Sequence, residues 1–251
     1  MKHGLARTKN VELFLAGVME LEQRGAREAN MLLVTGAPGS GKTSCLLRWT
    51  NDVNAIYLLG GPKLTPNWVL GDLILALGEK PLNSQERREL QARRLLARSG
   101  QAIVLDEAHY FLQGKAEPLE VIRKITARGD NSVILATMED IREELTRHQH
   151  IADRIVPTTV RMVDATVDDV RLCFTKLAEV DVADDLVCEV HHHTRGRYRL
   201  VKNAIALVER FAVRNKLSTV KQTDMVGEII SHDWRDNSPC KVRQPRLRKA
   251  S

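Results

Sequence analysis

The chain has 251 residues, of which 43% are hydrophobic and 4% aromatic, and 38 Lys and Arg against 32 Asp and Glu give a formal charge of +6. No apolar run approaches the roughly 18 to 20 residues of a membrane span, and the N-terminus lacks the apolar core of a signal peptide, so we expect a cytoplasmic protein with no membrane partner. The four cysteines lie far apart and none forms a Cys-x-x-Cys pair. This spacing argues against a disulfide framework and a structural zinc site.

Short apolar segments alternate with segments of helical periodicity over the first 165 residues. The apolar periodicity after Thr8 predicts a helix that ends near Gly25. The predicted strands span 31–35, 55–59, 102–105, 132–137 and 155–163, and the predicted helices between them span 42–50, 66–77, 83–98, 118–128 and 139–147. Strands that alternate with helices indicate an α/β fold with a parallel sheet flanked by helices.

From Thr166 onward the pattern predicts helices only. Thr166 and Asp169 have the spacing of a capping box, and helices are expected at about 167–180, 183–193, 198–215 and 222–231. Between residues 237 and 251 there are five Lys or Arg and no acid. We therefore predict an α/β domain at 1–165 that includes the N-terminal helix, an all-helical domain at 166–235, and a basic, disordered tail at 236–251.

A glycine-rich segment follows the first predicted strand and precedes a predicted helix. Its residues Gly36, Ala37, Pro38, Gly39, Ser40, Gly41, Lys42 and Thr43 match the pattern G-x-x-x-x-G-K-[ST]. In this context the backbone N–H groups of residues 36–44, the last of which is Ser44, can surround the phosphates of ATP. Lys42 would neutralise the β- and γ-phosphates, and the Thr43 hydroxyl would bind Mg²⁺.

The second half of the predicted site is the segment 102–107, in which an apolar strand ends in two acids. Asp106 can hold Mg²⁺ through water, and Glu107 can orient and activate the water that attacks ATP. The alternative is two surface acids that end a strand. Thr137, at the end of the strand 132–137, either contacts the γ-phosphate or the attacking water, or is an ordinary strand terminus.

In this order, the phosphate loop, the Asp-Glu strand, the polar strand end and the helical domain resemble the AAA+ ATPases, in which the helical domain is a lid. Five segments resemble more narrowly the DNA-transposition ATPases typified by the B protein of phage Mu, with the related TnsC, TniB and ExeA-type proteins. They are VLDEAHYF, EPLEVIRKI, VILAT, HIADRI and TRGRYRLVKNAIALVERFA. The resemblance covers about residues 8–215.

The resemblance implies roles for two arginines. In such proteins an Arg after the fourth strand reaches the ATP site of the neighbouring subunit, and the segment HIADRI places Arg154 there, with Arg147 as the alternative. A permanently charged guanidinium suits a transferring phosphoryl group. The Gly-x-x-Arg segment 196–199 matches the second sensor, so Arg199 would respond to the γ-phosphate in its own subunit.

Several basic and polar residues are candidates for contact with the DNA backbone. They are Lys63, Thr65, Arg195, Arg197, Lys241, Arg243, Arg246 and Arg248. Each is also consistent with a solvated surface residue or, for Thr65 before Pro66, with a helix cap. The triplet 191–193 of histidines has no Cys or carboxylate at ligand spacing, which argues against a metal site.

Together these features predict an ATPase that binds ATP and Mg²⁺, assembles as a homo-oligomeric ring or helical filament on double-stranded DNA, and recruits a transposase. Abundant Lys and Arg with few aromatic residues favour binding to DNA phosphates without sequence specificity. The alternatives are an ATPase of another assembly, either a helicase loader or an ExeA-like secretion factor, in which the nucleotide acts as a protein switch.

Overall fold

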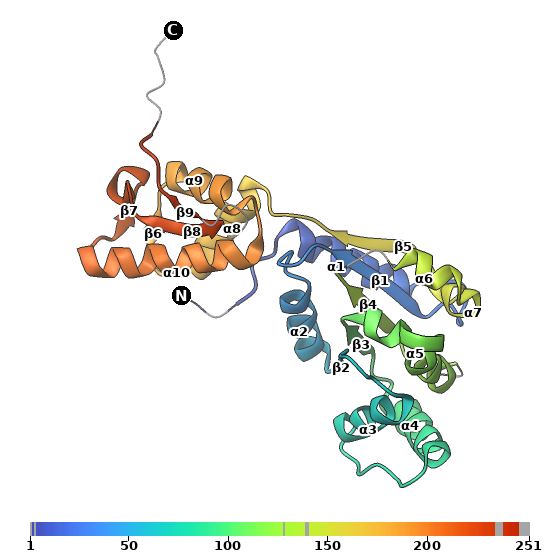
Figure 1. Ribbon diagram of the computed structural model, residues 1–251. Helices are drawn as coiled ribbons and strands as arrows, with labels where there is room; N and C mark the ends of the chain where they lie inside the picture. The colour runs from blue at the N-terminus through green and yellow to red at the C-terminus, as the bar shows by residue number, and fades with distance from the viewer. Residues whose placement is uncertain (1, 3, 128, 139–140, 234–237, 246–251) are drawn as a thin grey trace. The chain divides into compact units, whose positions relative to one another are not determined.

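The computed structural model describes residues 2, 4–127, 129–138, 141–233 and 238–245 (Figure 1). Within these residues, five parallel strands form one sheet in the order β2-β3-β4-β1-β5. The strands are β1 (Met31–Gly36), β2 (Ile56–Leu59), β3 (Ile103–Asp106), β4 (Val133–Thr137) and β5 (Ile155–Met162). The predicted α/β fold with a parallel sheet is confirmed.

The carboxyl ends of these strands bring predicted site residues to one edge of the sheet. Gly36 ends β1, Asp106 ends β3 and Thr137 ends β4. Thr137 is in register with Thr35 of the neighbouring strand. Ligands of open α/β sheets bind outside the carboxyl ends of the strands, so a ligand site is expected at this edge.

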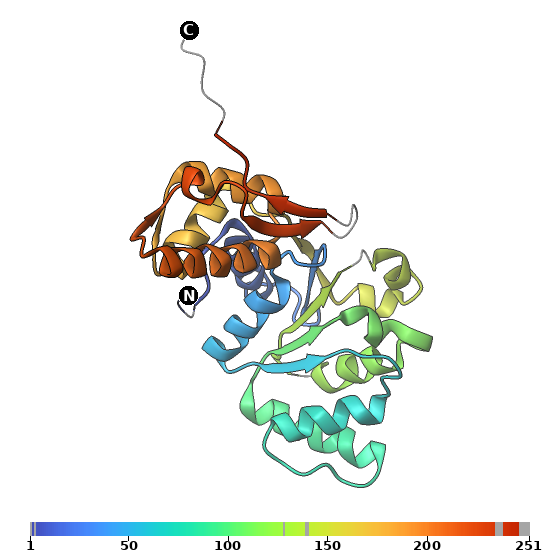
Figure 2. The same ribbon diagram turned by 60° about the vertical axis from the view of Figure 1, so that its left-hand side comes forward.

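Helices cover both faces of the sheet (Figure 2). Those in this part of the chain are α1 (Lys9–Glu22), α2 (Lys42–Val53), α3 (Pro66–Ala76), α4 (Gln85–Ser99), α5 (Gln113–Thr126), α6 (Arg142–Thr146) and α7 (Gln149–Ala152). Thr65 caps α3, because its hydroxyl accepts a hydrogen bond from the Trp68 backbone N–H at 3.3 Å. Ser84 is the N-cap of α4, because its hydroxyl accepts a hydrogen bond from the Arg87 backbone N–H.

The side chains of β1 alternate between the two faces of the sheet, as a strand requires. Met31 and Leu33 are buried in one apolar cluster with residues of α3, α4 and α5. Leu32 faces the other way and lies near Gly17 of α1. A Cβ at position 17 would overlap the side chain of Val160, so glycine allows α1 to pack closely on the sheet.

The C-terminal part is helical, as predicted, with two short pairs of strands that the sequence did not reveal. Its helices are α8 (Val167–Leu177), α9 (Asp184–Thr194) and α10 (Tyr198–Asn215), and β6 (Asp181–Val182) pairs with β7 (Thr219–Val220). Apolar residues of all three helices form a second buried cluster. The two-residue strands are too short to give a periodic signal in the sequence.

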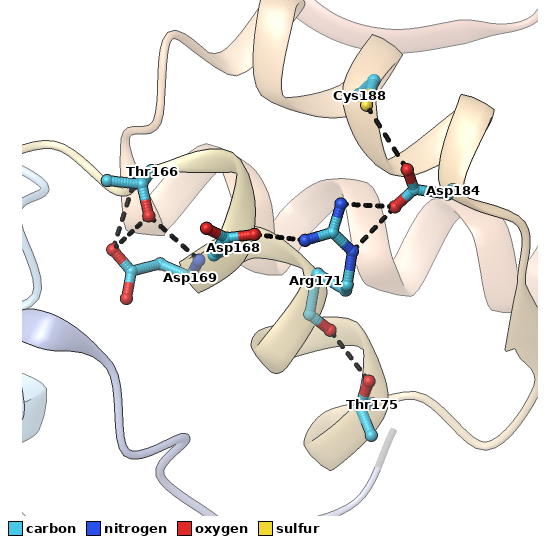
Figure 3. A network of polar contacts seen from close by, with 7 residues as sticks. All are labelled: Thr166, Asp168, Asp169, Arg171, Thr175, Asp184 and Cys188. Atoms are coloured by element: carbon cyan, nitrogen blue, oxygen red, sulfur yellow. Dashed lines mark hydrogen bonds and ion pairs between the residues drawn. The ribbon is translucent and has the colours of Figure 1, made fainter.

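Polar contacts at the start of α8 confirm the predicted capping box (Figure 3). The Asp169 backbone N–H donates to the Thr166 hydroxyl at 3.2 Å, and the Thr166 backbone N–H donates to the Asp169 carboxylate at 3.0 Å. Further along the helix, Arg171 forms ion pairs with Asp168 and with Asp184 of α9. The network therefore fixes the start of α8 and joins it to α9.

Two expectations for the last thirty residues are wrong. The segment predicted as a helix at 222–231 contains a short 3₁₀ helix, Gln222–Met225, followed after Gly227 by a strand, β8 (Ile229–Asp233). Gly227 has a φ of 85°, which a helix does not allow. The tail is not disordered from residue 236 onward, because β9 (Ser238–Lys241) pairs antiparallel with β8 and Val242 is buried.

The described residues group into two compact units. The sheet unit contains Leu13–Ala37 and Lys42–Met162, and the C-terminal unit contains the described residues of 1–12, 38–41 and 163–251. The middle of the glycine-rich loop thus belongs to the C-terminal unit, and its two ends belong to the sheet unit. Among the described helices, none has both the length and the apolar character needed to cross a bilayer.

Candidate functional site

The glycine-rich loop joins the end of β1 to the start of α2, in the strand–loop–helix context that the sequence predicts. The buried Lys42 ammonium donates hydrogen bonds to the backbone carbonyls of Gly36 (2.6 Å) and Ala37 (3.2 Å). Gly39 and Gly41 have φ values of 85° and 92°, a region that glycine adopts without steric cost. The hydrogen bonds of the Lys42 side chain to Gly36 and Ala37 connect the two ends of the loop.

The middle of the loop, Pro38–Gly41, makes its contacts within the C-terminal unit. Asn10 of α1 donates from Nδ2 to the Ser40 carbonyl at 3.0 Å, and the Arg199 backbone N–H donates to the Gly39 carbonyl at 3.4 Å. The buried Ser40 hydroxyl has no hydrogen-bond partner among the described residues. These contacts anchor the backbone of Arg199 to the loop, while the role of its guanidinium stays a prediction.

Asp106 is the most connected acid at the sheet edge. Its side chain is buried, and its Oδ2 accepts hydrogen bonds from the Thr43 hydroxyl at 2.9 Å and from the Tyr57 hydroxyl at 2.7 Å. Its Oδ1 accepts from the backbone N–H of Glu107 at 2.9 Å. Three donors therefore hold the carboxylate in one orientation beside the first turn of α2.

The oxygens of Thr43 and Asp106 fit the requirements of a Mg²⁺ site for a nucleotide. Mg²⁺ prefers oxygen ligands, and with nucleotides it usually takes one or two protein ligands, with phosphate oxygens and water completing the shell. A hydroxyl and a carboxylate 2.9 Å apart supply that small set. Lys42, which directly precedes Thr43 in the first turn of α2, can neutralise a phosphate.

Glu107 has the most unusual backbone conformation of the site. Its φ of 55° and ψ of 48° lie in the left-handed region, which non-glycine residues rarely adopt. A Cβ at Gly60 would lie 2.6 Å from the Glu107 carbonyl oxygen, so only glycine permits this approach of the two backbones. The side chain is 27% exposed, but its Oε2 is buried and lies 3.6 Å from Nδ1 of His109, beyond hydrogen-bond distance. This carboxylate oxygen therefore has no hydrogen-bond donor among the described residues.

Tyr57 of β2 is a site residue that the sequence did not reveal. Burial raises the pKa of its phenol, and the hydrogen bond to Asp106 raises that pKa further, so the hydroxyl keeps its proton and donates it. β2 pairs with β3 with Leu59 opposite Asp106, and side chains two residues apart share a face, so Tyr57 lies on the face of Asp106. Only the strand order makes this neighbourhood visible.

We expect Tyr57→Phe to weaken the response to Mg²⁺ more than the maximal rate. Without the phenol hydroxyl the Asp106 carboxylate loses one of its orienting donors, and a lost orienting partner of a metal ligand typically costs about tenfold or more in metal affinity. Half-maximal turnover should then need several-fold more Mg²⁺, with near-normal turnover at saturation. The control is Tyr110→Phe. The Tyr110 ring lies against that of His109, and its hydroxyl makes no hydrogen bond to a described residue. Equal Mg²⁺ titrations for both variants would contradict the assignment.

Thr137 is completely buried at the end of β4, next to β1 on one side and β3 on the other. The two interpretations of Thr137 are a contact with the phosphate or the attacking water, and an ordinary strand terminus. Both require Thr137 to end a strand at the carboxyl edge, and it does. Its contact with a phosphate or with the attacking water stays a prediction.

The two arginines considered for the neighbouring subunit differ in their surroundings. Arg154 directly precedes β5, and its Nη1 donates to the Glu28 carbonyl at 3.3 Å. Arg147 ends α6 and its side chain is exposed. Both therefore stay candidates, and mixing of subunits separates them, as described below.

The candidates for DNA contact lie in several separate segments. Lys63 is exposed in the loop after β2 with a φ of 64°, and the Thr65 hydroxyl is used to cap α3. Arg195 and Arg197 lie between α9 and α10, and Lys241 is exposed on β9. Arg246 and Arg248 lie outside the described residues.

Arg243 is one of the candidates for DNA contact, and its guanidinium forms an internal ion pair. Its Nε and Nη2 donate to the two oxygens of Glu189 at 2.9 and 2.8 Å, and its backbone N–H donates to the same carboxylate at 2.9 Å. His193 also lies 2.9 Å from Glu189. The ion pair joins the segment that follows β9 to α9.

The Glu189 ion pair should contribute to stability in a limited pH range. Burial alone would raise the pKa of this carboxyl, but the hydrogen bonds from Arg243 and His193 outweigh burial and lower it to about 2. Since the folded pKa is below the unfolded value of about 4.3, the contribution is present above that value and is lost as the pH falls toward 2.

We therefore expect Glu189→Gln to lower the free energy of unfolding near pH 7 by on the order of 2 kcal/mol. The deficit relative to the wild type should shrink as the pH is lowered from about 4.5 toward 2, as urea titrations would show. Arg243→Ala and the double variant complete a thermodynamic cycle. Additive losses in that cycle would mean that the two side chains do not act as a pair.

The histidine triplet makes protein contacts. His191 lies 3.0 Å from the Ala165 carbonyl, and His193 contacts Glu189. In the part of the chain that the structure describes, no group of three or more His, Cys, Asp or Glu side chains could hold a metal ion.

Residues 23–145 match the family model of the AAA domain. Among solved structures, the chain is similar to Cdc6p from Pyrobaculum aerophilum, with 15% identity and a TM-score of 0.59 over 90% of this chain and 66% of that one. It is similar to the ORC1 protein of Aeropyrum pernix in complex with DNA, with 15% identity and a TM-score of 0.60 over 89% and 64% of the two chains. It is also similar to a Walker-type ATPase of Pyrococcus abyssi, with 14% identity and a TM-score of 0.60 over 84% and 68%.

None of the curated proteins matches the sequence significantly. The chain spans less than two thirds of the ORC1 protein and about two thirds of Cdc6p. At these identities the likeness concerns the fold, which is that of AAA+ P-loop NTPases: a parallel sheet flanked by helices, followed by a helical C-terminal region.

Proposed function

We propose that this chain is an ATPase that assembles with ATP on double-stranded DNA and recruits a transposase to it. The observation that carries the proposal is the arrangement of Lys42, Thr43, Asp106 and Glu107 at the carboxyl edge of the sheet. It combines a buried ammonium in a glycine-rich loop, a hydroxyl and a carboxylate 2.9 Å apart, and a second carboxylate with a buried oxygen that has no described hydrogen-bond donor. This set is what phosphoryl transfer to water requires.

In this proposal the loop residues 36–44 hold the phosphates of ATP through backbone N–H groups, and Lys42 neutralises the terminal phosphates. Thr43 and Asp106 hold Mg²⁺, which when bound neutralises the charge that develops on the phosphate oxygens. Glu107 orients a water molecule and accepts its proton. The hydrogen bond from Tyr57 orients the Asp106 carboxylate for this role.

The proposed binding of DNA has two supports. Residues 190–221 contain eight Lys or Arg and one acid, and the chain has few aromatic residues, a composition that suits contacts to phosphates rather than to bases. The fold is also similar to that of the Aeropyrum pernix ORC1 protein, which was solved in complex with DNA. The proposed transposase partner rests on the resemblance of the five segments named above to the transposition ATPases.

Fluorescence anisotropy with a labelled duplex of arbitrary sequence tests the proposal. We expect binding that requires ATP, that is indifferent to sequence, and that weakens steeply as salt increases, because each phosphate contact releases counterions. Turnover of ATP is measured in the same samples. Binding that ignores ATP or salt would contradict the proposal and favour a nucleotide-dependent switch that acts on proteins, such as a secretion factor.

The proposed oligomer leads to a prediction that separates Arg154 from Arg147. An arginine that acts on a neighbour's ATP can be supplied by another subunit, so its alanine variant should regain turnover when mixed with Lys42→Ala protein, which keeps its own arginines. We expect recovery for Arg154→Ala and little initial loss for Arg147→Ala. Steady-state turnover across a series of mixing ratios is the measurement, and recovery by Arg147→Ala alone would reverse the assignment.

A further inference from the structure

Two buried polar atoms without hydrogen bonds lie next to each other beyond the end of β3. They are Oε2 of Glu107 and Nδ1 of His109, and neither has a hydrogen-bond partner among the described residues. The two atoms are 3.6 Å apart, and both residues belong to the sheet unit. Most buried polar groups in folded proteins are paired, so a carboxylate oxygen and a ring nitrogen left unpaired side by side need a physical explanation.

The other polar groups close to Glu107 already have partners. The hydroxyls of Thr43 and Tyr57 both donate to the Asp106 carboxylate, and the backbone N–H of Glu107 donates to it as well. These donors orient Asp106 and are not free to orient the neighbouring carboxylate. Among the described residues, Nδ1 of His109 is therefore the nitrogen left available to Oε2 of Glu107.

The backbone that carries the two side chains is anchored. The Tyr110 backbone N–H donates to the Glu107 carbonyl at 3.0 Å. His109 lies in a 3₁₀ helix, Ala108–Leu112, in which Phe111 is buried, and the His109 ring lies against the Tyr110 ring with the centroids 4.2 Å apart. Small rotations of the two side chains are enough to bring the atoms less than about 1 Å closer, which is normal hydrogen-bond distance.

We propose that His109 is a positioning residue, which donates a hydrogen bond from Nδ1 to Oε2 of Glu107 when ATP is bound. An imidazole with its proton on Nδ1 is a donor, and a carboxylate accepts. Catalytic hydrogen bonds are often long without substrate and shorten when it binds. Since Oε2 is buried and the Glu107 side chain is 27% exposed, the rest of the carboxylate is left to face the attacking water. The inference rests on the proposed function, in which Glu107 accepts the proton of that water.

Three substitutions of His109 in the full-length chain test this role by single-turnover hydrolysis of ATP. His109→Ala removes the donor and should slow hydrolysis on the order of tenfold, because the carboxylate loses the contact that orients it. Binding of a fluorescent ATP analogue should change by less than about twofold. His109→Asn has an amide nitrogen at the position of Nδ1 and should restore most of the rate, whereas His109→Gln has it at the position of Nε2 and should not.

A double-variant cycle with Glu107→Gln distinguishes positioning from a direct action of His109 on water. If His109 acts through Glu107, His109→Ala should slow the residual hydrolysis of Glu107→Gln no further. A second loss of the same size in the double variant would overturn the proposal. The control is His192→Ala, which removes an exposed histidine of α9 and should hydrolyse ATP as the wild type does.

Thermal unfolding is measured for every variant, because a structural role would lower Tm together with the rate. An unchanged rate in His109→Ala, or equal rates in His109→Asn and His109→Gln, would overturn the proposal. So would a loss of rate that simply follows a loss of Tm across the series. If Glu107→Gln hydrolyses ATP at the wild-type rate, the proposed role of Glu107 itself fails. That result is distinct from a slow Glu107→Gln beside a His109→Ala that matches the wild type.

Discussion

Glu107→Gln is expected to lower ATP turnover by about two to three orders of magnitude while ATP binding stays within a few-fold of the wild type. Glutamine keeps the size of the side chain but cannot accept the proton of the attacking water. The Oε2 of Glu107 is buried and has no hydrogen bond among the described residues, so its replacement breaks no described hydrogen bond at that atom. Single-turnover hydrolysis and analogue binding measure the two effects separately.

The same variant distinguishes a disassembly machine from a simple switch. If hydrolysis releases subunits from DNA, Glu107→Gln should accumulate as stable oligomers on DNA in the presence of ATP, visible in electron micrographs. A switch in which hydrolysis is incidental should assemble and release as the wild type does. Glu117→Gln is the control, since Glu117 is an exposed acid of α5. Normal turnover in Glu107→Gln would show that the water is activated by another group.

The parts of the site that the sequence predicted depend on short-range signals. The phosphate loop combines a contiguous motif with a strand before it and a helix after it, and the acids at 106 and 107 follow an apolar strand directly. In each case the residues that matter are within a few positions of one another. Alternation of apolar segments likewise predicted the parallel sheet, because burial on both faces leaves a continuous apolar run.

The parts that the sequence did not predict depend on long-range pairing. Tyr57 meets Asp106 only because β2 lies beside β3, and strand order is not encoded in the spacing of either segment. Arg243 looked like one of several cations of a tail, yet Glu189, 54 residues earlier, holds it against α9. A count of charges along the sequence predicts that such an arginine faces solvent or DNA. In the structure it instead pairs with a buried acid.

The ordered strand β9 also affects which residues are candidates for DNA contact. Arg243 pairs with Glu189, whereas Lys241 of β9 is exposed and stays a candidate. Removal of residues 237–251 would therefore take away β9 and the Glu189 partner, and it would damage the fold of the C-terminal unit. Point variants of exposed candidates such as Lys63 and Lys241 separate DNA contact from folding, which a truncation does not.

Lys42→Ala should abolish the stabilisation of the protein by ATP. At a ligand concentration of 100 times Kd, binding adds about 2.7 kcal/mol to the free energy of unfolding, which in a chain of this size raises Tm by roughly 5 to 10 °C. The ammonium is buried and already directed into the loop by the Gly36 and Ala37 carbonyls, so no other described cation can replace it without rearrangement of the loop. We expect the wild type to show this shift with Mg²⁺ and ATP and the variant to show almost none.

Two further variants make that result specific. Lys80→Ala removes an exposed lysine of the same unit and should keep the full shift of Tm. Lys42→Arg keeps the charge but replaces a compact ammonium with a wide planar group that the carbonyls of Gly36 and Ala37 do not accommodate, so it should lose most of the shift. A full ATP-dependent shift in Lys42→Ala would mean that nucleotide binds elsewhere. It would remove the basis for assigning hydrolysis to the edge of the sheet where Asp106 and Glu107 lie.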